Sequence, residues 1–396
     1  MMAAVTAAEN GAAVLLIEKN ERLGRKLAIT GKGRCNLTNN CDITEFMENI
    51  PRNGRFLYST LSKFSTEDTM SFFEGLGVPL KTERGKRVFP VSDKAADIVN
   101  ALSVRLNELG VKIIRENVRS LIINEGRCCG VNTHPGQYTG NAVILAAGGA
   151  SYPRTGSDGF GYTLARQAGH TIVPPRPSLC PLVTKDGRVG EAAGLTLKNA
   201  SVKLHRGKKL VYEDFGELAF TADGVSGATV LSASAHIEGE PTEYALCVDL
   251  KPALSEEKLD ARILRDFAEL KNDVFAQAAR KLLPKEMCGL FSEIAGISMD
   301  TKIAEITKVQ RKNMVNTLKN LRLEIADFRP IAEAIVTRGG VSVKEIEAAT
   351  MKSKLCEGLF LAGEIIDVDG YTGGFNLQIA FTTGFAAGQN AAYTNR

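Results

Sequence analysis

The two ends of this chain repeat one pattern, in which a small-residue helix and a short apolar strand are joined by a glycine turn. At the start, a helix (Met1–Glu9) and a turn (Asn10-Gly11) lead into an apolar run (Val14–Ile17) and the acidic Glu18. In a βαβ nucleotide unit such a helix follows a strand and a glycine-rich loop, and an acid about 20 residues on binds ribose hydroxyls. We therefore expect that first strand and glycine loop directly before Met1, which predicts a truncated start.

The C-terminal segment "GLFLAGEIIDVDGYTGGFNLQIAFTTG" carries the stronger form of this pattern. An apolar run ends at Gly363 and Glu364, and a glycine-rich turn then opens a helix at Gly374, Asn376 and Leu377. Glycines let the backbone approach a ligand, and the free amides of a helix N-terminus suit an anion or an electron-rich ring edge. Two such sites suit a long dinucleotide, and we predict noncovalent FAD. The alternative is a structural corner between strand and helix.

Two further glycine-rich stretches lie between the ends. One is a basic loop, which contains Arg25, Lys26, Gly31, Gly33 and Arg34. Basic groups on flexible backbone suit phosphate or ribityl contacts, and a solvated basic loop is the alternative. The other stretch places Gly148 and Gly149 directly after a predicted strand, 142–146, where a nucleotide crosses a sheet edge. The weak candidates for catalysis are Tyr152, Arg154 and Tyr371, for each of which a structural role is the alternative.

Local patterns also predict several elements that carry no chemistry. "SDKAADIVNALSVRLNELG" predicts an amphipathic helix with Ser92 as its N-cap and Gly110 at its C-terminal end. The stretch 118–149 predicts a β-meander that ends in a buried strand. His170 closes "LARQAGH", and we interpret it as a histidine favoured by the negative end of a helix.

The order of these elements predicts an α/β protein in three segments. We expect a discontinuous Rossmann-type FAD-binding domain at 1–175 and 329–396. Between its parts we expect an inserted β-barrel-like domain at 176–328, with a small helical subdomain at about 254–310. Short strands such as "EYALCVDL" favour a barrel or a small sheet, and "LRLEIADF" indicates a strand that returns to this β part. The helix formers from Pro252 favour the subdomain.

Composition excludes several classes of protein. The chain has 396 residues with 49 basic and 45 acidic side chains, and no basic run indicates nucleic acid or an anionic membrane. No apolar run approaches the ~20 residues that a membrane span needs, so we expect a cytoplasmic protein. The eight cysteines form no CxxC pair and the four histidines do not cluster, so we expect no metal site. A redox role for the vicinal Cys128-Cys129 is less favoured than a plain hairpin end. The oligomeric state is left open.

The motifs together resemble one bacterial flavoprotein family. These motifs are "LGRKLAITGKGRCNLTNN", "ERGKRVFPVSDKAADIV", "AAGGASYPRTGSDGFGYTLARQAGHTI", "FRPIAEAIVTRGGV" and "GLFLAGEIIDVDGYTGGFNLQIAFTTG". The family comprises NAD(P)/FAD-dependent oxidoreductases of the aminoacetone-oxidase type, and it includes the clostridial 3-dehydro-bile acid Δ4,6-reductase of bile-acid 7-dehydroxylation. The resemblance spans nearly the whole chain.

The resemblance implies a role for each matched residue. Glu18 would hold the adenosine ribose, Val118 would contact adenine through its backbone, and Arg25, Lys26 and the Gly31–Gly33 loop would lie along the cofactor. Gly363 and Glu364 would meet the ribityl or pyrophosphate part, and Gly374, Asn376 and Leu377 the isoalloxazine end. The family's opening GGGxAG motif is absent. Ala222 and Ala228 stand where the family commonly has His and Pro, so an acid–base role for that His does not carry over.

The leading hypothesis is an FAD-dependent oxidoreductase with NAD(P)H as co-substrate. Its expected substrate is a small molecule, with an enone-type 3-oxo bile acid or steroid as the best guess because one relative is assigned that reaction. Two alternatives remain open. The first is an amine or aminoketone oxidase that uses oxygen, and the second is a non-catalytic FAD-binding protein.

Overall fold

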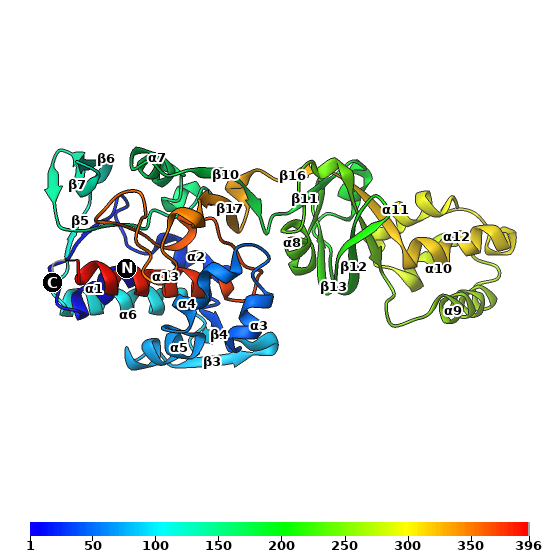
Figure 1. Ribbon diagram of the computed structural model, residues 1–396. Helices are drawn as coiled ribbons and strands as arrows, with labels where there is room; N and C mark the ends of the chain where they lie inside the picture. Colours follow the sequence, from blue (N-terminus) through cyan, green and yellow to red (C-terminus); the bar gives the residue numbers. More distant parts are fainter. Residues whose placement is uncertain (395–396) are drawn as a thin grey trace. The chain divides into compact units, whose positions relative to one another are not determined.

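The computed structural model describes residues 1–394 and divides the chain into two compact units. The first unit contains residues 1–178 together with the C-terminal part from Pro330, and the second contains Leu179–Arg329 (Figure 1).

Two pairs of parallel strands organise the first unit. The pairs are β1 (Leu15–Ile17) with β5 (Lys112–Ile114), and β9 (Val143–Leu145) with β18 (Leu359–Leu361). Because β18 comes from the C-terminal segment, the two ends of the chain contribute to one unit. At the carboxyl ends of β1, β9 and β18, the chain continues into Glu18, Gly148 and Gly363.

Antiparallel strands complete the first unit. The three-stranded sheets are β6 (Asn117–Asn124), β7 (Arg127–His134) and β8 (Gln137–Thr139), which confirm the predicted meander, and β2 (Thr38–Asn39), β4 (Arg87–Pro90) and β3 (Leu80–Glu83). A two-stranded ribbon joins β10 (Ile172–Ser178) to β17 (Val336–Val341).

The first unit also contains several helices. They are α1 (Met2–Glu9), α2 (Arg25–Ile29), α3 (Ile43–Glu48), α4 (Tyr58–Leu61), α5 (Thr66–Gly75), α6 (Ala95–Glu108), α7 (Phe160–Gln167) and α13 (Phe375–Ala392). Figure 1 shows α1 and α13, the first and last helices, side by side. They approach closely at Gly388 of α13, where a Cβ would lie only 2.3 Å from the carbonyl oxygen of Ala3. The absence of a side chain on this glycine permits the approach.

The predicted start of α6 is wrong by two residues. Its N-cap is Lys94, and no side chain caps the helix. Ser92 lies in the preceding turn, where its hydroxyl accepts a hydrogen bond from the Lys94 amide at 3.3 Å. Gly110 follows the helix with φ 68°, a left-handed conformation that suits glycine beyond a helix C-terminus.

The second unit is a closed six-stranded barrel with a helical part. The barrel order is β11 (Leu182–Thr184), β14 (Gly224–Ser226), β13 (Lys209–Phe220), β12 (Thr196–Arg206), β15 (Tyr244–Asp249) and β16 (Leu321–Phe328). The helices are α8 (Ala228–Ser234), α9 (Glu256–Glu269), α10 (Phe275–Leu282), α11 (Lys285–Ala295) and α12 (Lys308–Lys319). One continuous core joins barrel and helices, with Leu246, Phe275 and Met314 buried in it. The strand predicted at "LRLEIADF" is confirmed as β16.

All eight cysteines are free thiols. Burial raises the pKa of Cys128, on β7, to about 11, so this thiol is a weak nucleophile. Among residues 1–394, no helix combines the length and the apolar character that a membrane crossing requires.

Candidate functional site

An ion pair joins the basic loop to the C-terminal segment. Lys26 lies on α2, Glu364 follows β18, and their Nζ and Oε2 atoms are 2.5 Å apart. Lys26 Nζ also donates to the Ser151 hydroxyl at 2.7 Å and to the Ser157 hydroxyl at 3.4 Å. The Lys26 and Glu364 side chains keep only 25% and 19% of their exposure. Three regions far apart in sequence therefore meet at the carboxyl ends of β9 and β18.

The backbone beside this ion pair has no room for side chains. A Cβ on Gly149 would lie 2.5 Å from Thr337 Oγ1 and 3.0 Å from Glu364 Oε1, and one on Gly148 would lie 2.9 Å from Ser157 Oγ. The Thr337 amide donates to Glu364 Oε1 at 2.8 Å. These glycines are required for the close approach that brings Glu364 against the turn after β9.

Glu18 lies at the carboxyl end of β1, as the sequence predicts. Its Oε1 accepts hydrogen bonds from the amide and the side-chain nitrogen of Asn20, both at 2.8 Å. The same Asn20 nitrogen donates to the Thr155 carbonyl at 3.1 Å. Within residues 1–394, Glu18 Oε2 has no hydrogen-bond partner, so it can accept from the hydroxyl of a ligand.

The basic loop divides between two environments. Arg25 is exposed and donates from Nη1 to Asn20 Oδ1 at 3.0 Å, beside Glu18. Gly31 and Gly33 have φ values of 56° and 84°, which a side chain would strain. The loop therefore turns sharply after α2.

Arg34 does not join the Lys26–Glu364 pair. Its Nη2 lies 2.5 Å from Glu83 Oε1 and 2.6 Å from Asp93 Oδ1, and its guanidinium lies 4.2 Å from the Phe89 ring centroid. Hydrogen bonding to Arg34 lowers the pKa of Glu83. The Arg34 charge is therefore balanced by Glu83 on β3 and by Asp93 in the segment after β4.

The N-terminus of α13 is fixed by its glycine cap and by Asn376. Gly374 has φ 103°, and a Cβ there would lie 2.3 Å from the Thr38 carbonyl oxygen. Asn376 Oδ1 accepts from the Gly370 amide at 2.9 Å, and its Nδ2 donates to the Gly370 carbonyl at 2.7 Å. The Asn376 side chain thus holds the turn, while its backbone amide lies in the open first turn of α13. Leu377 packs against the core around α1, α5 and α6.

A second ion pair, which the sequence analysis missed, holds the same turn from the other side. Arg52 Nη2 donates to both carboxylate oxygens of Asp369 at 2.9 Å, and the Ser178 hydroxyl donates to Asp369 Oδ2 at 2.6 Å. The Tyr371 amide donates to the Asn49 carbonyl at 3.0 Å. Asp369 is only 1% exposed. Burial raises the pKa of Tyr371, so its phenol is protonated at neutral pH.

A buried tyrosine near Glu364 was also missed. Tyr162, on α7, is 3% exposed, and its hydroxyl has no hydrogen-bond partner among the described residues. Burial raises its pKa, and the charges of Glu364 and Asp367 raise it further. The glycine-rich stretch "GSDGFG" directly precedes Tyr162 and is the only local signal for it. The burial of Tyr162 depends on residues far away in the sequence, so no local pattern predicts it.

The remaining predicted site residues are Tyr152, Arg154 and Val118. Tyr152 has φ 52° in the turn after Ser151, and Arg154 is exposed in the next turn. Val118 lies on β6 opposite Thr133 and packs against a core cluster. In the part of the chain that the structure describes, no three His, Cys, Asp or Glu side chains are grouped to hold a metal ion.

Comparisons with known proteins identify the family. The model of the HI0933-like protein Rossmann domain matches residues 1–390. The chain is 32% identical to the 3-dehydro-bile acid delta(4,6)-reductase of Clostridium scindens, over 99% of this chain and 96% of that protein. It is 30% identical to the ribosomal RNA dihydrouridine synthase of Haemophilus influenzae, over 98% of this chain and 94% of that protein.

The structure is also similar to that of a flavocytochrome c3 fumarate reductase in its open conformation. That match has a TM-score of 0.50 at 19% identity and covers 99% of this chain and 76% of the other, which shows the fold alone.

The fold and the family therefore define a class, the Rossmann-type flavin-dependent oxidoreductases. The chain belongs to the HI0933-like family. The predicted fold class, α/β with a Rossmann-type domain and a barrel, is confirmed.

The residues present fit FAD. Glu18 offers a free carboxylate oxygen at a strand end, bare glycine backbone follows β9, and the first turn of α13 presents amides behind a glycine cap. FAD is one extended ligand with three kinds of group. Its hydroxyls require an acceptor, its anionic part requires close backbone, and its aromatic end requires amide donors.

Proposed function

We propose that this chain uses FAD to reduce a carbon–carbon double bond conjugated to a carbonyl, with a 3-oxo-Δ4 bile acid or steroid as substrate and NAD(P)H as reductant. One observation carries the proposal. Two relatives that align over nearly the whole chain are named for different substrates but for one chemistry. A delta(4,6)-reductase of a 3-oxo steroid saturates an enone, and dihydrouridine is uridine with its conjugated 5,6-double bond saturated.

We also propose roles in cofactor binding, which the geometry of the site supports. FAD, when bound, supplies the hydride chemistry. Glu18 Oε2 would accept from ribose hydroxyls, and the backbone at Gly148 and Gly363 would pass close to the cofactor. Lys26 Nζ donates hydrogen bonds to Glu364, Ser151 and Ser157. We therefore propose that Lys26 orients Glu364. The other predicted contacts with FAD stay predictions, and they involve Arg25, Gly31, Gly33, Arg34 and Val118.

Tyr371 is the side chain we propose to polarise the substrate carbonyl. Hydride addition to the β-carbon places negative charge on the carbonyl oxygen, and a positioned donor stabilises that charge. Tyr371 lies in the turn that Asp369 and Asn376 fix, directly before the first amides of α13, and its raised pKa keeps the phenol a donor. Tyr152 and Arg154 are the other candidates.

The test is an anaerobic reaction of the FAD-loaded protein, reduced with NADPH or NADH, with a 3-oxo-Δ4 bile acid. We expect flavin reoxidation and a product heavier by two hydrogens. Tyr371→Phe should lower kcat by about 10²-fold, the usual effect of removing one such donor. Tyr393→Phe is the matched control. The Tyr393 hydroxyl lies at the far end of α13 and donates to Asn10, so this variant should react as the wild type does. A reduced flavin that persists with the steroid present contradicts the substrate assignment.

A second candidate substrate is a uridine of ribosomal RNA. The synthase-named relatives of Haemophilus influenzae and Escherichia coli, 30% and 28% identical, favour it. The prediction that this chain has no nucleic-acid partner is therefore untested. Incubation of the reduced protein with unmodified ribosomal RNA, followed by nucleoside analysis, separates the two candidates. Dihydrouridine formed without steroid turnover would replace the steroid assignment.

The amine-oxidase alternative and the cytoplasmic location stay predictions. Hydrogen peroxide released from aminoacetone would support the former.

A further inference from the structure

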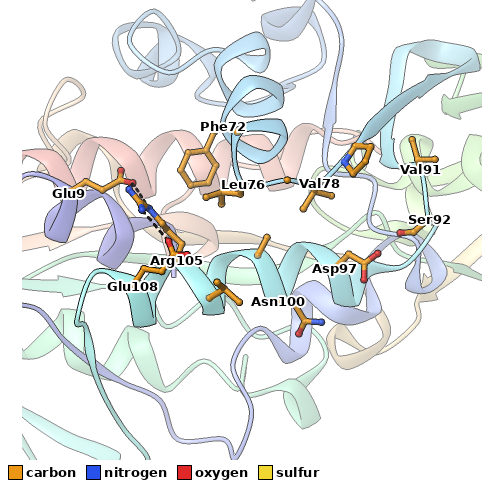
Figure 2. Close-up of a pocket in the computed structure, with 15 residues that line it drawn as sticks. Glu9, Phe72, Leu76, Val78, Val91, Ser92, Asp97, Asn100, Arg105 and Glu108 are labelled. Carbon is orange, nitrogen blue, oxygen red and sulfur yellow. Dashed lines mark hydrogen bonds and ion pairs between the residues drawn. The ribbon is translucent and has the colours of Figure 1, made fainter.

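A groove with apolar walls lies on the first unit (Figure 2), and neither Lys26 nor Glu364 lines it. It has a volume of about 820 Å³ and runs between the C-terminal half of α5 and one face of α6. Phe72, Leu76 and Val78 form one wall, and Ala101 and Val104 lie on the α6 side. Val104 is 56% exposed and Val91, at one end of the groove, is 53% exposed.

This face of α6 is distinct from the face that packs in the core. Ile98, Leu102 and Leu106 are buried at helical spacing. At 100° per residue, Asp97, Ala101, Val104, Arg105 and Glu108 share a second face, which lines the groove. α6 therefore presents a second face, with Ala101 and Val104 among charged side chains, that the described residues leave open.

The charges on this face are arranged with opposite signs about Ala101. Lys94 lies seven residues before Ala101 and Glu108 seven after it, while Asp97 and Arg105 lie four before and four after. In an antiparallel pair of identical helices centred on Ala101, Lys94 would face Glu108 and Asp97 would face Arg105, each twice. Such a twofold surface is self-complementary. Lys94 and Asp97 form no ion pair among the described residues.

We propose that the α5–α6 groove receives α6 of a second copy of this chain, as an antiparallel pair centred on Ala101. Alanine at the centre lets the helices approach closely, and Val104 and Val91 would cover apolar surface beside it. Arg105 Nη2 is already 2.8 Å from Glu9 Oε1 and Arg105 Nη1 3.2 Å from Glu108 Oε2, so the guanidinium is held on the groove side (Figure 2). The proposal is independent of the enzyme's substrate.

Light scattering after size exclusion tests the proposal on the full chain at about 100 µM, where a weak interface is populated. We expect a dimer for the wild type. Asp97→Arg should raise the dimer dissociation constant about tenfold or more, because the introduced cation would face Arg105 of the other copy at two symmetric contacts. Arg105→Asp should do the same. An equimolar mixture of the two variants should recover the dimer, since opposite charges then face each other.

Asn107→Arg is the matched control, because Asn107 is exposed on α6 outside the groove. It should leave the dimer unchanged. Far-UV circular dichroism confirms that each variant is folded. A monomeric wild type, or an Asp97→Arg variant that dimerises as the wild type does, overturns the proposal.

A cysteine cross-link tests the register separately. Ala101→Cys should form a disulfide-linked dimer under mild oxidation, because the symmetry axis places two copies of residue 101 together. Asn107→Cys should not. Cross-linking at position 107 and not at 101 overturns the register.

Discussion

At the residue scale, the Lys26–Glu364 ion pair determines how the basic loop meets the C-terminal turn. Lys26→Met would leave Glu364 with the Thr337 amide and the Ser151 hydroxyl but without a cation. Removing one partner of a buried pair is costly, and the partial exposure reduces this to about 2 kcal/mol. The measurement is urea unfolding followed by circular dichroism.

Lys19→Met is the control for that prediction. Lys19 pairs with Asp158 at 2.7 Å, but the two side chains are 30% and 47% exposed. An exposed pair contributes less than about 1 kcal/mol. Equal losses for the two variants would show that Lys26 has no special role in stability.

His170 lies just beyond the C-terminus of α7, as the sequence indicates, but its main contacts are not with the helix end. Its side chain is fully buried, with Nδ1 3.2 Å from Glu345 Oε2 and Nε2 2.8 Å from Ser353 Oγ. Burial lowers its pKa, although hydrogen bonding to Glu345 raises it in part. The helix-dipole rule missed this because the partners lie more than 170 residues away along the chain.

The lowered pKa of His170 predicts a pH dependence of stability. The unfolded state takes up a proton below about pH 6.5, while the folded state resists it. The contribution of His170 to the free energy of unfolding should therefore be complete above that pH and should decrease as the pH is lowered further. His170→Gln should remove this part of the slope. His134→Gln, at an exposed position, should keep it, and a wild-type stability that is flat from pH 7 to about 5 would contradict the prediction.

At the scale of elements, the turn before α13 depends on glycine at one position. Gly374 combines φ 103° with a Cβ position 2.3 Å from the Thr38 carbonyl oxygen. Gly363 has φ 78°, but the nearest atom to its Cβ position is 3.9 Å away. Gly374→Ala should therefore destabilise the chain by about 2 kcal/mol more than Gly363→Ala, because a clash adds to backbone strain. Thermal unfolding compares them, and equal losses would refute the role of the close contact.

Sequence predicted elements better than the contacts between them. The alternation of apolar residues and turns was sufficient for β16 and the meander, because these signals are local. The start of α6 was misplaced because Ser92 resembles a cap that the turn uses differently. Arg52–Asp369 and Tyr162 were missed because burial and pairing across more than 300 residues leave no periodic signal.

At the scale of the whole molecule, both chain ends contribute strands and helices to one unit. The small residues of α1 pack against α13, whose Gly388 admits Ala3. This arrangement brings Glu18, Gly148, Gly363 and the start of α13 into the same unit. We propose that these strand ends bind FAD.

Equilibrium titration of the purified chain with FAD, followed by flavin fluorescence, tests that claim most directly. We predict saturable binding, and binding about tenfold weaker for Glu18→Gln, which loses the charged acceptor at the end of β1. Glu21→Gln, exposed three residues away, should bind as the wild type does. A chain that shows no saturable binding, or a Glu18→Gln variant that binds FAD as tightly as the wild type, would contradict the account.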